Sequence, residues 1–175
     1  MGKRTIKTVI LLLVFLLILF CGTTFALMLR QTDFLNNQLE AAEVTCAVAE
    51  TFENNTKTSI AVRNTGTIDA YLRVRLVSYW EDQEGNILSK PSEIPEITPA
   101  NGWLKGPDNT YYYPAPVAPD GVTQNLLSEG ITLEEEDGCR QVVEVFADAI
   151  QSKPVHAVTD SWGVTIANGK ISAAP

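Results

Sequence analysis

Few residues in this chain could carry out nucleophilic, acid–base or metal chemistry. The single histidine, His156, is followed by Asp160 and Ser161, which suggests a Ser-His-Asp arrangement. Because serines and aspartates are common, their nearness to one histidine is weak evidence for a triad. One histidine supports no conventional zinc site, and neither Cys-x-x-Cys nor His-Glu-x-x-His occurs. We therefore expect no enzyme, no cofactor and no catalytic or metal-binding residues.

The cysteines offer a different chemistry, that of the disulfide bond. Cys21 lies within an apolar run, which leaves Cys46 and Cys139 in the rest of the chain. In an oxidising compartment these two could join and close a loop of roughly 94 residues, which stabilises a fold by up to about 4–5 kcal/mol. The alternative is a pair of buried free thiols that act as small hydrophobic side chains. The sequence leaves both open.

Aromatic residues in the middle of the chain could form a ligand-binding surface. Rings gathered on one exposed patch can stack on sugars, whereas the same residues inside a β-sheet protein form part of its core. Both interpretations apply to the same five residues: Trp80, Trp103, Tyr111, Tyr113 and Trp162.

Charge limits the range of partners. The first thirty residues contain four basic and no acidic residues, so the remainder has nine basic against twenty-one acidic residues, a net charge of −12. Such a domain repels nucleic acid. Its densest acidic run, residues 134–137, lacks the spacing of a calcium-binding loop and is expected to be a solvated loop.

The N-terminus predicts a membrane segment. Lys3, Arg4 and Lys7 precede an uncharged apolar run over residues 8–29, closed by Arg30. As a helix this run reaches about 33 Å, enough to span a hydrocarbon core of roughly 30 Å. The basic residues before it place the N-terminus in the cytoplasm and the rest of the chain outside.

The same run can also be a secretory signal peptide. Small residues at Thr24 and Ala26 offer a cleavage site, so the protein is either anchored in the membrane or secreted after cleavage near Ala26. A lipid-anchored Cys21 is disfavoured because Phe20 precedes it. We divide the chain into an anchor or signal (1–30), a stalk (31–43) and an extracellular domain (44–175).

The extracellular part shows the pattern of an antiparallel β-sandwich. Short alternating segments recur between turn signals at intervals of roughly 8–12 residues. The clearest covers residues 70–80, where Leu72, Val74 and Leu76 alternate with Arg73 and Arg75. The β-branched segment 139–150 predicts a central strand. A proline-led helix is expected at 154–162, followed by a turn at Asn168-Gly169.

Several of these segments resemble the TasA and camelysin group of exported Gram-positive proteins. That group has a basic-hydrophobic signal, a first strand, a (K/R)NTG turn and an AYxRV strand. The corresponding residues occur here in the same order: Thr32-Asp33, Asn36 or Asn37, 44–48, Arg63-Asn64-Thr65-Gly66, 70–74, 103–106, 111–113 and Ala118-Pro119-Asp120-Gly121 with Thr123.

The resemblance implies a jelly-roll-like sandwich exported by the general secretory route. Some members polymerise into biofilm-matrix fibres by donating an N-terminal segment as a strand to the next subunit, which would make residues 31–42 the donor. Camelysin relatives have been described as metal-dependent peptidases, but this chain lacks their expected metal motif.

Three functions follow in order of preference. The first is a non-enzymatic cell-surface or matrix protein, such as a fibre or assembly subunit, that self-associates or binds other surface proteins. The second is a membrane-tethered glycan-binding module that uses the aromatic residues above. The third, disfavoured, is a peptidase-like enzyme. In each case the membrane is contacted through residues 8–29.

Overall fold

The computed structural model describes residues 2, 6–18 and 41–175, which belong to two compact units, residues 1–41 and 42–175. In the first unit, residues 6–18 are helical. No helix within the described part of the chain is both long enough and apolar enough to cross a membrane. The predicted apolar run 8–29 continues beyond residue 18, so part of it, including Cys21, lies outside the described residues. The same is true of most of the stalk.

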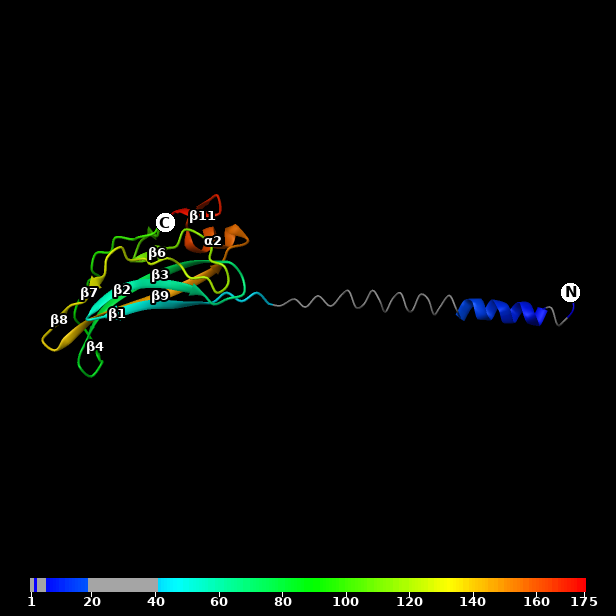
Figure 1. The fold of residues 1–175 in the computed structure, drawn as a ribbon, viewed down its shortest axis with the longest axis horizontal. Coiled ribbons are helices and arrows are strands. Elements are labelled where there is room, and N and C mark those ends of the chain that lie inside the picture. The colour runs from blue at the N-terminus through cyan, green and yellow to red at the C-terminus, as the bar shows by residue number, and fades with distance from the viewer. Residues whose placement is uncertain (1, 3–5, 19–40) are drawn as a thin grey trace. The chain divides into compact units, whose positions relative to one another are not determined.

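The second unit is mainly antiparallel β-structure, which confirms the predicted class (Figure 1). Its elements in chain order are β1 (Cys46–Glu53), β2 (Thr56–Asn64), β3 (Ala70–Glu81), β4 (Ile87–Leu88), β5 (Leu104–Lys105), β6 (Thr110–Tyr112), β7 (Ile131–Thr132), β8 (Glu135–Glu136), β9 (Cys139–Gln151), α2 (Val155–Trp162), β10 (Thr165–Ala167) and β11 (Lys170–Ala173).

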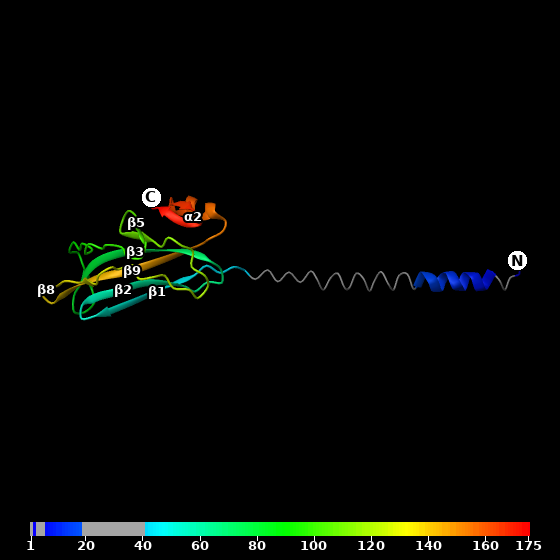
Figure 2. The same ribbon diagram turned by 45° about the horizontal axis from the view of Figure 1, so that its top comes forward.

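The strands form two facing sheets and a small hairpin. One sheet has the order β1-β2-β7, and the other has the order β5-β6-β3-β9-β8, with β4 beside the end of β3. Figure 2 shows β1 and β2 in one layer and β3 and β9 in the other. The sheets curl around their shared core as a half-barrel. The hairpin β10-β11 and helix α2 follow β9, and the proline-led helix predicted from the sequence is confirmed.

Local turn chemistry explains where the strands reverse. Asn54 and Asn55 connect β1 to β2 with φ of 48° and 59°, and the terminal Asn168-Gly169 pair connects β10 to β11 with φ of 51° and 70°. Positive φ at both central residues is the mark of the tight turn whose twist matches antiparallel strands. Asn and Gly adopt it at the lowest cost, so the predicted turn at Asn168-Gly169 is confirmed.

The core has two parts, one on each face of β3. The larger lies between the two sheets and contains fifteen buried residues. The smaller lies on the opposite face of β3, under α2 and the β10-β11 hairpin: Tyr71, Tyr112, Val158, Trp162, Val164 and Ile171. Both lie within residues 42–175, so this unit has a hydrophobic core of its own.

Asn64 fixes the entry of the chain into the domain. Its side chain is fully buried, donates from Nδ2 to the carbonyls of Ile68 and Val117 at 2.8 Å each, and accepts from the Gly66 amide at 3.0 Å. The turn formed in this way holds the segment before β1. The Thr67 amide donates to the Glu43 carbonyl at 2.9 Å, and a Cβ on Gly66 would lie 2.3 Å from that oxygen. Glycine is therefore required for this close approach.

We expect Asn64→Ala to lower the free energy of unfolding by about 3 kcal/mol, because it leaves buried backbone groups without hydrogen bonds. Chemical denaturation of residues 31–175 measures the change. Gln124→Ala is the matched control, since the Gln124 side chain is exposed and should change stability by less than about 0.5 kcal/mol. Equal losses in the two variants would contradict this role for Asn64.

Candidate functional site: a groove along two unpaired strand edges

Within the part of the chain that the structure describes, two neighbouring strands each have one edge without a partner. Among these residues, β1 pairs only with β2. β9 pairs with β3 along its whole length, but on its other side β8 covers only Cys139 and Arg140. From Val142 onward, no other described strand pairs with this edge of β9. The sequence predicts a central strand here, and β9 does lie between β3 and β8, but β8 covers only its first residues.

Along each of these two strands, every second side chain faces the core. We call this set of core-facing side chains the inner row of the strand. The register pairs Cys46 with Asn64 and Val48 with Val62, so the inner row of β1 continues the buried row of β2. In β9 the inner row pairs with the buried row of β3 and consists of Val143, Val145, Ala147 and Ala149. Val143 is buried, but the other apolar members of both rows remain half exposed. The core is therefore incompletely covered along this side.

Part of each inner row, from Val48 in β1 and up to Val145 in β9, borders a groove of about 480 Å³. Residues from β1, the β1-β2 turn, β2 and β9 line it, together with Tyr79 and Leu133. Its apolar side chains include Val48, Phe52 and Val145. Glu50, Lys57, Arg140 and Glu144 contribute both signs of charge.

Lys57 enters this groove because of a β-bulge. The pairing of β1 with β2 shifts register between Thr51 and Phe52, so that Thr51 pairs with Ser59 but Phe52 pairs with Lys57. Side chains of a strand alternately face the core and the solvent, and the extra residue at the bulge shifts this pattern by one position. The first residues of β2 therefore face the side opposite to the one that strict alternation gives. The Lys57 side chain is consequently only 6% exposed, and its Nζ lies 2.5 Å from Glu50 Oε2.

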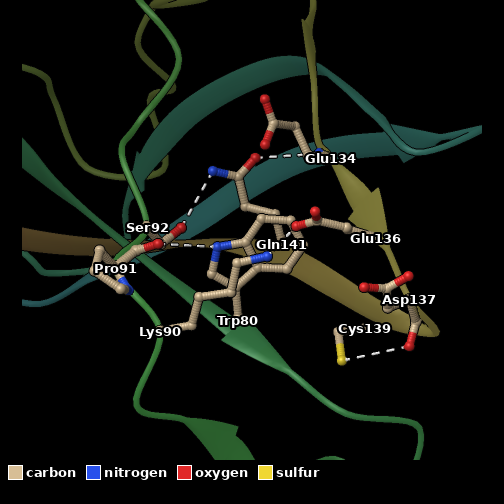
Figure 3. Close-up of polar contacts among 9 residues, drawn as sticks. All are labelled: Trp80, Lys90, Pro91, Ser92, Glu134, Glu136, Asp137, Cys139 and Gln141. Atoms are coloured by element: carbon tan, nitrogen blue, oxygen red, sulfur yellow. Dashed lines mark hydrogen bonds and ion pairs between the residues drawn. The ribbon is translucent and has the colours of Figure 1, made fainter.

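One end of the larger sheet is held by the buried amide of Gln141 (Figure 3). Its Nε2 donates to the Glu93 carbonyl at 2.7 Å and to Ser78 and Ser92 Oγ at 3.2 Å, while its Oε1 accepts from the Glu134 amide at 3.1 Å. One side chain thus ties two loops to β3 and β9.

Trp80 lies beside this amide network and is buried. Its Nε1 donates to the Pro91 carbonyl at 3.2 Å, and Lys90 Nζ lies 3.8 Å from the ring centroid (Figure 3). Lys90 also forms an ion pair with Glu136, and the hydrogen bond and positive charge of Lys90 hold the pKa of that carboxyl below its usual range. These contacts fix the loop after β4 and do not expose the ring.

The other proposed binding aromatics also pack inward. Trp103 donates from Nε1 to the Gln124 carbonyl at 3.0 Å and meets Tyr113 edge-on at 5.2 Å between centroids. Trp162 packs against Tyr112 in the smaller core, and Tyr111 is buried in the larger one. A glycan-binding module requires several of these rings on one exposed patch. They do not form such a patch.

Cys46 and Cys139 are both free and half-buried. Cys139 begins β9, whereas Cys46 lies close enough to Asp148 for that charge to act on its thiol. Asp148 is nine residues beyond Cys139, about 30 Å along an extended strand. A disulfide requires Cα atoms within about 7 Å. The structure therefore favours two free thiols over a disulfide between these cysteines.

The residues of the suggested triad all lie on α2. Asp160 accepts from Thr159 Oγ1 at 3.3 Å, and none of the hydrogen bonds found in the described residues joins His156, Asp160 and Ser161 to one another. Within the same part of the chain, no group of three or more His, Cys, Asp or Glu side chains is placed to hold a metal ion.

Neither the groove nor the part that Lys57 plays in it follows from the sequence pattern. The open edges depend on which strands pair, and the inward turn of Lys57 depends on a bulge. Strict alternation from Ile60 and Val62 would place Thr58, and not Lys57, on the inner face. Comparison with known protein families, curated proteins and solved structures finds no match.

The environment of Cys46 makes its reactivity predictable. Burial, and then the negative charge of Asp148, raise the pKa of the Cys46 thiol. A raised pKa leaves less thiolate, which is the reactive form. In residues 31–175 we expect Asp148→Asn to speed alkylation of Cys46 by about two- to fivefold at a pH of about 8, with Cys139 unchanged. Peptide mass spectrometry measures both rates.

Glu144→Gln is the matched control, since it removes a carboxylate from the same face of β9 at a different position. An equal rate of Cys46 alkylation in the two variants would show that Asp148 has no special influence on the thiol.

Proposed function

We propose that this chain is an exported, non-enzymatic protein of the cell surface or extracellular matrix, whose domain self-assembles by accepting a strand from another copy. The observation that carries the proposal is the groove between β1 and β9. Among the described residues its backbone edges have no strand partner beyond the start of β9, and most apolar side chains of its inner rows are half exposed. A strand added there pairs with backbone groups and covers apolar side chains in a single event.

Strand donation from one copy to the next is a heterologous contact. The donor segment and the acceptor groove are different surfaces of the chain, so each copy can accept one neighbour and donate to another. Contacts of this kind produce rings or open filaments. A fibre or assembly subunit is therefore the form of surface protein that we propose, with a second copy of the chain as the partner.

The resemblance to the TasA and camelysin group supports export and assembly. Two of the segments that carry it, residues 63–66 and 70–74, form the turn around Asn64 and the start of β3. In line with that group, we assign the two facing sheets to a jelly-roll-like sandwich. The net charge of −12 beyond residue 30 argues against nucleic acid as a partner.

For localisation, we propose that residues 8–29 direct the chain to the membrane and that the domain lies outside the cell. The run then either remains as an anchor or is removed near Ala26. Uncleaved protein would be a tethered surface domain, and cleaved protein would be a released matrix component.

We expect residues 31–175 to form concentration-dependent multimers and residues 42–175 to remain monomeric, because only the longer fragment contains the donor. Truncation before residue 42 spares Glu43, which is bonded to Thr67 of its own domain. Sedimentation velocity over a range of concentrations measures the difference. As a control, residues 31–41 are replaced by a Gly-Ser sequence of equal length. Equal assembly of all three fragments would contradict the proposal.

Intact mass measurement on membrane and culture-fluid fractions tests the proposed localisation. Assembly into a matrix predicts a chain that starts near Leu27 in the fluid, because cleavage frees the donor. A full-length chain in the membrane fraction would make the protein a tethered surface domain. Recovery of the full-length chain only in the cytoplasm would contradict export.

A further inference from the structure

The groove contains a buried positive charge at one end. Lys57 is 6% exposed, while the side chain of its partner Glu50 is 41% exposed. Removing an ammonium group from water is costly, and one partly solvated carboxylate compensates for that cost only in part. The bulge that turns Lys57 inward therefore places a charge in the groove that the packing of the two sheets does not require.

Lys57 retains capacity to bind a second acceptor. An ammonium group has three N–H donors. Among the described residues, Glu50 Oε2 is the acceptor that Lys57 uses, and the Phe52 ring centroid lies 6.0 Å from Nζ. An incoming carboxylate could bond to Nζ without displacing Glu50. Such charge-assisted hydrogen bonds are among the stronger and more selective ones in proteins.

We propose that Lys57 recognises a carboxylate on the strand that fills the groove, and that this carboxylate is Asp33 of a second copy. The inference rests on the proposed strand donation, and it names the residue pair that fixes the register of the inserted strand. The groove thereby selects one alignment of a segment that would otherwise be free to slide.

The sequence of residues 31–41 favours Asp33 over the other acid in that segment, Glu40. As a strand, alternate residues share a face. The face that contains Asp33 also contains Leu35 and Leu39, which suit the half-exposed rows of β1 and β9. The face that contains Glu40 has Phe34 as its single large apolar residue, with Asn36 and Gln38 between.

The position of the groove agrees with Asp33 and Leu35 in this register. Glu50 lies toward one end of the inner row of β1, with Lys57 of β2 beside it, and Cys46 lies at the other end. The groove extends from this charged pair to Val48 and Val145. With Asp33 at Lys57, Leu35 follows at about 7 Å along an extended strand and lies within the groove.

The test measures binding of a synthetic peptide of residues 31–41 to the domain of residues 42–175 by titration calorimetry. We expect Lys57→Met in the domain, or Asp33→Asn in the peptide, to weaken binding by roughly ten- to a hundredfold. Combining the two should weaken it no further than the stronger single change, because both remove the same bond.

Matched controls separate charge recognition from general effects. Lys170→Met removes an exposed lysine on β11, and Glu40→Gln removes the other acid of the peptide. Both should leave the affinity within about twofold of the parent. Circular dichroism verifies the fold of the domain variants, and Met at position 57 retains the apolar volume of the lysine stem.

Each outcome decides one of the two proposals. If residues 31–175 multimerise but the peptide does not bind, or if it binds equally well to the Lys57→Met domain, recognition by Lys57 is wrong and assembly stands. If Glu40→Gln weakens binding and Asp33→Asn does not, the proposed register is wrong. If residues 31–175 remain monomeric at every concentration, the assembly proposal itself fails.

Discussion

The arrangement of this domain depends on the long antiparallel pairing between β3 and β9. That pairing extends from Ala70 with Gln151 to Glu81 with Arg140, so it builds most of the larger sheet from two strands. One face of β3 supports the main core, and the other supports α2 and the C-terminal hairpin. Because β8 is so short, the same pairing leaves the second edge of β9 open. The groove is a direct consequence of this unequal sheet.

Two buried amides keep the surroundings of the groove in place. Asn64 holds the turn that receives the segment before β1, and Gln141 holds the loops beside β3 and β9. Each amide uses both donor and acceptor atoms, as burial of polar groups requires. The open strands are therefore attached to fixed loops at both ends of the sheets, which favours a preformed groove for an incoming strand.

Open strand edges also carry a risk, since they can pair with unrelated chains. β9 has the β-branched and aromatic composition that promotes such pairing, but the charged residues Glu144 and Asp148 interrupt its apolar sequence. In β1, Glu50 and Glu53 interrupt the apolar sequence in the same way. The acidic character of the whole domain adds repulsion between copies. A buried lysine that favours one carboxylate-bearing strand is consistent with edges that remain open but selective.

The sequence by itself determined the local elements. Alternation in residues 70–80 predicted β3, the Asn-Gly pair predicted the last turn, and the proline predicted the start of α2, because each depends on neighbouring residues alone. The tertiary structure decided which strands lack partners, turned Lys57 inward through a bulge, buried the aromatic rings and separated Cys46 from Cys139. Apart from the bulge, which lies in the hairpin where Phe52 pairs with Lys57, these outcomes depend on contacts between residues far apart in the chain. Hydrophobic periodicity shows neither where a bulge interrupts a strand nor which distant strand, if any, completes a sheet.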